Sequence, residues 1–166
     1  MAQGQITIGI AGNSPTNFTT AAIPSLVLAK TAGILSDRTQ INPLAIAGRS
    51  SYGTLAVDGS AFAPRYGWEL SAVVTEDEAL ILESLLQWQK VNPTSGLRLI
   101  DEVEYLAPAP TQSRTLLATL NPSWNASYVY GYGVFQVILT MGDDWKERFG
   151  RFRERLYQVT LGAEEL

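Results

Sequence analysis

One stretch decides the fold of this chain: residues 66–106, which read YGWELSAVVTEDEALILESLLQWQKVNPTSGLRLIDEVEYL. A helix begins near its middle. The Thr75 side chain can accept a hydrogen bond from a free amide of the first turn, and Glu78 can bond back to the Thr75 amide. Consecutive carboxylates in that first turn also favour the positive end of the helix dipole. The pattern predicts an α-helix over residues 76–90, ended by the Asn-Pro pair that follows.

Apolar side chains of this helix repeat at three- and four-residue spacing, which is typical of one buried face. That face carries Ala79, Leu82, Leu85, Leu86 and Gln89. Strands are predicted on both sides of the helix because apolar residues alternate there. The first, residues 66–74, places Trp68, Leu70 and Ala72 on one face. The second, residues 97–106, places Leu97, Leu99, Val103 and Tyr105 on one face and Arg98, Glu102 and Glu104 on the other.

Further strands are predicted outside this stretch. Alternating isoleucines predict one at residues 6–10, and the others are expected at residues 26–28, 114–120 and 128–141. Glycines within residues 128–141 indicate a bulge or a close backbone approach. Residues 143–162 fit two patterns. Trp145, Phe149, Phe152 and Leu156 have helical spacing, whereas Tyr157, Val159 and Leu161 alternate as in a strand. A short helix or turn leading into a final strand is favoured.

Residues 12–65 are rich in small and polar residues and are predicted to form an assembly arm region of hairpins and loops. Asp58-Gly59 indicates a turn between residues 55–57 and 61–63. Loops of this length are usually functional or are ordered by a partner. The predicted fold class is α+β, mainly antiparallel β, with one flanking helix and a barrel-like arrangement. Residues 1–166 are expected to form a single domain.

The composition limits the chemistry available. The chain has no histidine and no cysteine, so the commonest general base, thiol nucleophiles and the commonest zinc ligands are missing. A net charge of −4 argues against general nucleic-acid binding. Only 17 % of residues are charged and 46 % are apolar, which fits either a well-filled core or a surface covered by partners. The start lacks a signal-peptide pattern, and the apolar runs are too short to span a bilayer.

Paired carboxylates are the remaining candidates for catalysis, but a structural role is favoured for each. Asp101 would diverge from Glu102 on a strand, while Glu102 and Glu104 would share a solvated face with Arg98 close enough to pair. Asp143-Asp144 resembles a turn or a helix cap more than a metal site. No catalytic, cofactor-binding or metal-binding residue is therefore assigned, and the chain is not expected to be an enzyme.

Two groups of side chains point to binding surfaces. The basic group is Lys146, Arg148, Arg151, Arg153 and Arg155, with acidic residues interleaved. A salt-bridged surface or a subunit interface is favoured there over a nucleic-acid patch. The second group is Trp68, Trp88, Trp124 and Trp145, with Tyr128, Tyr130 and Tyr132. These rings fit core and interface packing, with a sugar-binding platform as the alternative.

The segments 66–70, 75–89 and 97–101, followed by a long late strand, resemble the minor tail proteins of tailed bacteriophages. The resemblance covers about residues 60–162. It implies a tail-tube-like β-barrel or sandwich and a structural role as a ring subunit of the tail tube, distal tail or baseplate. It also implies partners among copies of this chain and other tail or baseplate proteins, and a place in the virion after synthesis in the host cytoplasm. The family supplies no catalytic residue and no cofactor. The alternative function is a carbohydrate- or receptor-binding β module.

Overall fold

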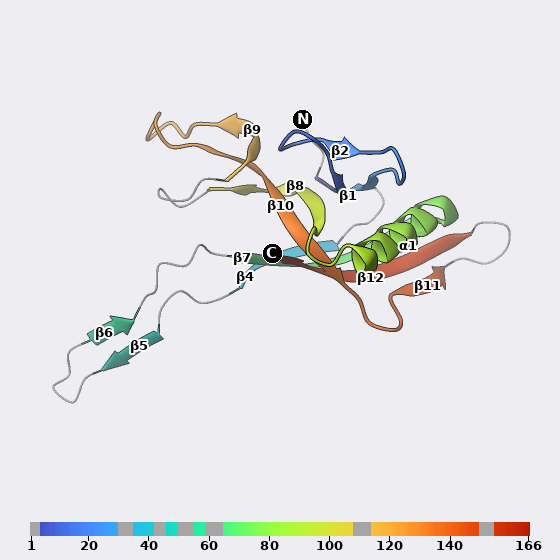
Figure 1. Cartoon of the computed structure of the whole chain (residues 1–166). Helices are drawn as coiled ribbons and strands as arrows, with labels where there is room; N and C mark the ends of the chain where they lie inside the picture. The colour runs from blue at the N-terminus through green and yellow to red at the C-terminus, as the bar shows by residue number, and fades with distance from the viewer. Residues whose placement is uncertain are drawn as a thin grey trace.

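The computed structural model describes residues 4–29, 35–41, 46–49, 55–58, 65–107, 114–149 and 155–166 (Figure 1). The strands are β1 (Gln5–Ala11), β2 (Phe18–Thr19), β3 (Leu26–Ala29), β4 (Leu35–Ile41), β5 (Ile46–Arg49), β6 (Leu55–Asp58), β7 (Arg65–Thr75), β8 (Leu97–Leu106), β9 (Leu116–Leu120), β10 (Tyr130–Thr140), β11 (Lys146–Phe149) and β12 (Leu156–Glu165). The helix is α1 (Glu76–Val91).

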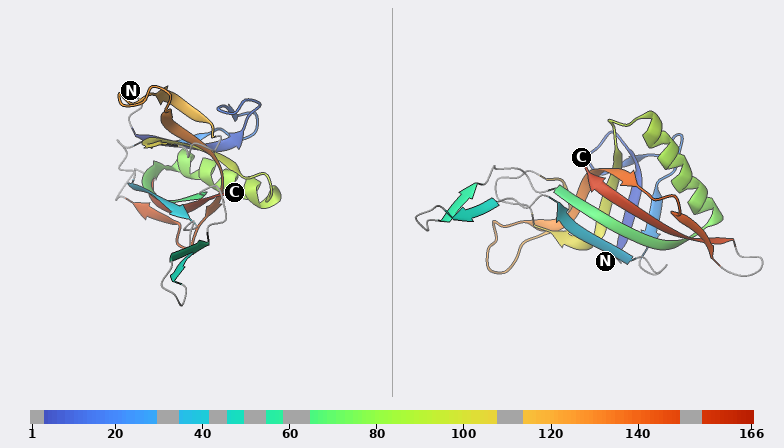
Figure 2. Two further views of the ribbon diagram at one scale, coloured as in Figure 1. Left: turned by 90° about the vertical axis from the view of Figure 1, so that its left-hand side faces the viewer. Right: turned by 90° about the horizontal axis from the view of Figure 1, so that it is seen from below.

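Most of the strands belong to one 10-stranded antiparallel sheet with the order β2-β1-β8-β10-β12-β7-β4. Strand β3 also pairs with β1, β9 with β10 and β11 with β12. The sheet folds over so that β4, β7 and β12 form one layer and β1, β2 and β8 another, with the long β10 crossing between them (Figures 1 and 2). The expected α+β class with antiparallel strands is confirmed.

The expected barrel is wrong, because the sheet does not close on itself. Strand β4 ends the sheet order and pairs only with β7 in the described residues. A barrel would require the two edges of the sheet to hydrogen-bond to each other. Here, instead, the side chain of Arg38 in β4 reaches across to β8, as described below, so the two layers are joined without a continuous backbone ladder.

The helix α1 packs its apolar stripe on this folded sheet, against β12, β7 and β3. The predicted buried residues of the stripe are buried: Ala79, Leu82, Leu85 and Leu86. The predicted capping box is also present, with Thr75 Oγ1 accepting from the Glu78 amide at 3.3 Å and Glu78 Oε2 accepting from the Thr75 amide at 2.8 Å. The helix boundaries agree with the sequence prediction within one residue.

Gln89, the polar member of the stripe, extends the sheet with its side chain. Its amide nitrogen donates to the Leu139 carbonyl at 2.9 Å, and its amide oxygen accepts from the Leu139 amide at 2.8 Å. In the register of β10 with β8, the last pair before this point is Val137 with Leu97, where β8 begins. Leu139 lies two residues beyond Val137, so Gln89 bonds to β10 at a point where the chain before β8 no longer pairs with it.

Strand β8 departs from simple alternation. Opposite β10, Tyr132 pairs with Tyr105 while the adjacent Gly133 pairs with Asp101, so the intervening part of β8 bulges. The glycine-associated irregularity predicted in β10 is thereby confirmed. The prediction that Tyr105 shares a face with Leu97 and Leu99 is wrong. Those two leucines are buried, whereas Tyr105 is 50 % exposed and Leu106 is buried instead, because the bulge shifts the alternation.

The region of residues 12–65 contains β2, β3, β4 and the separate two-stranded sheet of β5 and β6. Strand β6 pairs with β5, with Ala47 opposite Val57, whereas residues 61–63 of the predicted hairpin lie outside the described residues. Strands β4 and β7 pair up to Ile41 opposite Arg65. Between these two residues the structure describes only β5 and β6.

The C-terminal segment is built from strands. A turn at Asp143 and Asp144 leads into β11, which pairs with β12 from Lys146 opposite Val159 to Phe149 opposite Leu156. The predicted turn and final strand are confirmed, while the predicted short helix is wrong for residues 146–149. Backbone pairing with the edge of β12 outweighs the helical spacing of the aromatic residues there.

Candidate functional site

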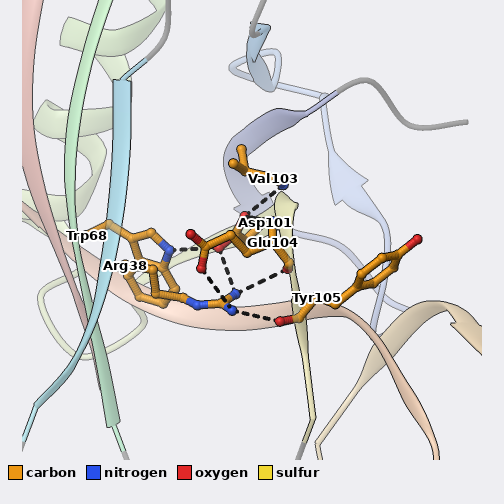
Figure 3. A network of polar contacts seen from close by, with 6 residues as sticks. All are labelled: Arg38, Trp68, Asp101, Val103, Glu104 and Tyr105. Atoms are coloured by element: carbon orange, nitrogen blue, oxygen red, sulfur yellow. Dashed lines mark hydrogen bonds and ion pairs between the residues drawn. The ribbon is translucent and has the colours of Figure 1, made fainter. Parts of the chain in front are cut away.

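A buried ion pair joins the two layers of the sheet (Figure 3). Asp101 of β8 is fully buried, and its Oδ2 accepts from Arg38 Nη1 at 2.9 Å and from Trp68 Nε1 at 3.1 Å. Its Oδ1 accepts from the Val103 amide at 2.9 Å and from the Glu104 amide at 3.4 Å, which holds the bulge of β8. Both carboxylate oxygens are therefore occupied by structural hydrogen bonds.

Arg38, which belongs to β4, also bonds to the backbone beyond Asp101. Its Nη1 donates to the Glu104 carbonyl at 3.4 Å and its Nη2 donates to the Tyr105 carbonyl at 3.0 Å (Figure 3). The guanidinium lies 5.6 Å from the centre of the Tyr66 ring. A buried charge needs a full set of partners to offset desolvation, and this network provides one.

A second ion pair, between Arg114 and Glu165, also lies beside the Tyr66 ring. Glu165 of β12 accepts from Arg114, with Nη2 to Oε2 at 3.1 Å, and its Oε2 also accepts from the Tyr66 amide at 3.0 Å. The Glu165 carbonyl accepts from Arg65 Nε at 3.0 Å. Arg114 lies 5.3 Å from the Tyr66 ring centre and 5.4 Å from the Phe135 ring centre. These contacts attach the segment before β9 to the end of β12.

The carboxylates considered for catalysis are separated by this arrangement. Glu102 Oε2 accepts from Gln5 Nε2 at 2.5 Å, and Glu104 Oε2 lies 3.5 Å from Arg38 Nη2. The predicted pairing of Arg98 with these glutamates is wrong. Arg98 instead donates to the Ser14 carbonyl at 2.7 Å and to the Asn17 carbonyl, and so holds the turn between β1 and β2. Its partial burial lowers the Arg98 pKa through desolvation.

Asp143 and Asp144 are exposed in the turn that precedes β11. In the described part of the chain, no group of three or more carboxylates comes together as a metal ion would require.

Part of the basic C-terminal group lies on a surface with ion pairs. Lys146 Nζ is 3.5 Å from Glu83 Oε2, and Arg155 Nη1 is 3.0 Å from Glu76 Oε2. Both partners belong to α1, not to the acidic residues interleaved in the sequence. The side chains of the other three members, Arg148, Arg151 and Arg153, are outside the part of the chain that the structure describes.

The tryptophans divide between core and surface. Trp68 is buried as predicted and packs edge-on against Phe135, with ring centres 4.7 Å apart. Trp88 and Trp145 are half-buried against the core. Trp124 is 72 % exposed and lies beside Tyr128, with ring centres 5.2 Å apart.

A tyrosine cluster, made of the exposed Tyr105 and the half-buried Tyr130 and Tyr132, lies where β8 pairs with β10. Tyr105 stacks on Tyr132 with ring centres 4.6 Å apart and meets Tyr130 edge-on at 5.2 Å. The hydrogen bond with the Tyr105 hydroxyl raises the pKa of Tyr132, and partial desolvation and the nearby charge of Glu102 act in the same direction.

The two-stranded sheet of β5 and β6, called the arm below, projects from the end of the molecule remote from α1 (Figures 1 and 2). It is not hydrogen-bonded to the main sheet in the described residues. An isolated two-stranded sheet is at best marginally stable in water, and a third strand or an apolar surface normally supports it.

The outward side of α1 bears a groove of about 650 Å³. Half of its lining residues are apolar and half are polar: Ile23, Leu80, Trp88 and Val91, with Glu83, Ser84, Gln87 and Asn92. Leu80 is 55 % exposed and Val91 is 79 % exposed, although both side chains are large and apolar. Large apolar side chains gathered on one exposed face are typical of an interaction surface.

The sequence did not single out Arg38, Arg114 or Glu165. The sequence does contain a sign of the Arg38–Asp101 pair. Asp101 follows Leu97 and Leu99 at every second position, so it is expected on the same buried face of the strand. A carboxylate at a core-facing position predicts a buried cation. Which arginine would supply it depends on how the sheet folds over, and the local sequence does not contain that information.

Comparison with known protein families, with curated proteins and with solved structures finds no match for this chain. None of the helices in the described ranges has the length and apolar character needed to cross a bilayer.

Proposed function

We propose that this protein is a structural component of a bacteriophage tail that assembles with copies of itself into a ring in the tail tube, distal tail or baseplate. The observation that carries the proposal is the arm, a two-stranded sheet that extends beyond the main sheet. Such a sheet gains little stability from its own pairing, so it is expected to fold against another subunit.

The open main sheet also supports self-association. Strand β4 ends the sheet, and its outer edge is not paired with any strand in the described residues. Free edges are sites where another chain can add a strand. A contact between different surfaces of identical subunits closes into a ring when the rotation between them allows it.

The test removes the arm without disturbing the ladder that carries it. Residues 42–64 are replaced by Asn-Gly, which connects the opposed pair Ile41 and Arg65 through a two-residue hairpin turn. Light scattering after size exclusion and negative-stain imaging then compare the full chain with this armless variant. Rings or tubes of the full chain and a folded monomer of the armless variant are expected. A full chain that stays monomeric across the micromolar range would contradict the proposal.

A second candidate function is a carbohydrate-binding module, favoured by the exposed rings of Tyr105 and Trp124 and by the half-buried ring of Tyr132, which stacks on Tyr105. Aromatic rings with a polar end are common where a surface binds a partner. This function predicts a monomer whose tryptophan fluorescence changes when oligosaccharides are added. Substituting Trp124→Ala should remove that change, and Trp88→Phe should leave it.

A further inference from the structure

We infer that a pocket beside Arg98 binds the carboxylate group of a small organic acid. The pocket has a volume of about 270 Å³ and lies where β8 and β10 pair, next to the turn between β1 and β2. Arg98 of β8 lines the pocket together with Gln136 and Val134 of β10, Thr115 and Pro15. Pockets for drug-sized ligands occupy about 300 to 1,000 Å³, so this pocket suits a smaller molecule.

The walls of the pocket are held in place by the fold itself. Gln136 lies directly opposite Arg98 in the register of β10 with β8. The turn that carries Pro15 is tied by a hydrogen bond from the Ser14 amide to Asn17 Oδ1 at 2.9 Å. A ligand would therefore enter a site that already has its shape, and little loss of conformational freedom would oppose binding.

Arg98 supplies the charge that would bind the ligand. Its Nη1 donates to the Ser14 carbonyl at 2.7 Å and to the Asn17 carbonyl, and both acceptors are uncharged. Within the described part of the chain, Nε and Nη2 of Arg98 have no hydrogen-bond partner. These two nitrogens form an edge of the guanidinium that can donate two parallel hydrogen bonds to one carboxylate.

The positive charge of Arg98 is partly withdrawn from water. Burial lowers the pKa of Arg98 through desolvation, so the charged form bears a cost in this pocket. None of the described residues that line the pocket is acidic. A bound carboxylate would offset the desolvation cost, because a partly buried charge is stabilised by a hydrogen-bonded partner of opposite sign.

The remaining lining residues favour a singly charged ligand with a short apolar part. One guanidinium neutralises one negative charge, whereas dianions such as phosphate are usually held by several cations or backbone amides. The net charge of −4 further opposes binding of a dianion. Val134 and Pro15 offer apolar contact for carbon atoms, and the hydroxyl of Thr115 can donate to a carboxylate oxygen.

Butyrate is the probe for the first test, and butyramide, which has a similar shape without the charge, is the control ligand. Ligand-detected NMR with the full chain measures binding whether the chain is monomeric or assembled. Butyrate is expected to bind with a Kd on the order of 1 mM, about tenfold more tightly than butyramide or inorganic phosphate. Equal affinities for butyrate and butyramide would overturn the inference, and so would tighter binding of phosphate than of butyrate.

Substituting Gln136→Glu tests whether the binding occurs at Arg98. The new carboxylate would lie directly opposite Arg98 and neutralise it from within, so the affinity for butyrate should fall by about tenfold or more. Gln87→Glu is the matched control, because it adds the same charge on the exposed face of α1 and should leave the affinity unchanged. The midpoint of denaturant unfolding checks that both variants are folded. An unchanged affinity in Gln136→Glu would overturn the inference.

Substituting Arg98→Lys gives an independent test. The ammonium group of lysine keeps the positive charge beside the turn but lacks the planar pair of donors. The affinity for butyrate should therefore fall by about tenfold, and binding as tight as that of the unaltered chain would contradict a site built on the guanidinium. Binding of butyrate does not require subunits to assemble, so neither result alters the proposal of a ring.

Discussion

Arg38 Nη1 lies 2.9 Å from Asp101 Oδ2, and this contact joins β4 to β8, which three other strands separate in the sheet order. The side chains are 8 % and 1 % exposed. The contact forms only because the sheet folds over and brings its last strand against β8. The ion pair therefore holds the main sheet in its folded-over shape. In a closed barrel, backbone hydrogen bonds between the two edge strands would do this instead.

Substituting Asp101→Asn should lower the free energy of unfolding by roughly 3 to 5 kcal/mol, because it removes the buried anion from Arg38 and leaves only the exposed carboxylate of Glu104 at 3.5 Å. Denaturant unfolding of the armless variant, which is expected to be monomeric, measures this loss. The control is Arg155→Gln, which breaks an exposed ion pair with Glu76 and should leave the unfolding midpoint nearly unchanged. A similar midpoint for the two variants would show that the Asp101 network does not hold the layers together.

Substituting Gln89→Leu should destabilise the protein by about 2 kcal/mol, since the Leu139 amide and carbonyl would lose their partners at the edge of β10. Gln87→Leu is the matched control on the exposed face of the same helix. Thermal and denaturant unfolding compare the two. Hydrogen exchange at the Leu139 amide gives a local readout, and unchanged protection there in Gln89→Leu would argue against the proposed extension of the sheet.

Substituting Gly131→Ala should disrupt the pairing of β9 with β10. A Cβ at this position would lie 2.6 Å from the Leu117 carbonyl oxygen, too close for the backbone to remain in place. The expected loss of stability is about 1 to 3 kcal/mol. Gly142→Ala is the control, because nothing lies within 4 Å of the added methyl group. That change should be neutral or stabilise the fold by up to about 1 kcal/mol.

Tyr132 should make folding stability fall at high pH. Its pKa is raised above the ordinary value of 10.0, chiefly by the hydrogen bond with Tyr105. A raised pKa means that the folded state retains the proton after the unfolded state has lost it. The stabilisation is therefore complete below pH 10.0 and is lost as the pH rises through the folded pKa. Phenolate absorbance should show the Tyr132 transition at lower pH in Tyr105→Phe, and an unshifted transition would exclude the hydrogen bond as its cause.

The sequence by itself determined the local elements. Thr75 and Glu78 specify the start of α1, and the spacing of its leucines specifies the buried face, because capping and helical periodicity involve residues only a few positions apart. The alternation of Ile6, Ile8 and Ile10 likewise predicted β1. These signals depend on short-range geometry, so they can be read without knowing what the elements pack against.

Only the tertiary structure decided how the sheet folds over and which distant residues meet. The bulge at Asp101 reversed the expected orientation of Tyr105, and pairing with β12 made residues 146–149 a strand despite their helical spacing. Arg38 and Asp101 lie 63 positions apart in the chain, and Arg114 and Glu165 lie 51 apart. Such pairs depend on strand order and curvature, and these are set by the packing of the whole core because no short segment of the sequence contains both partners.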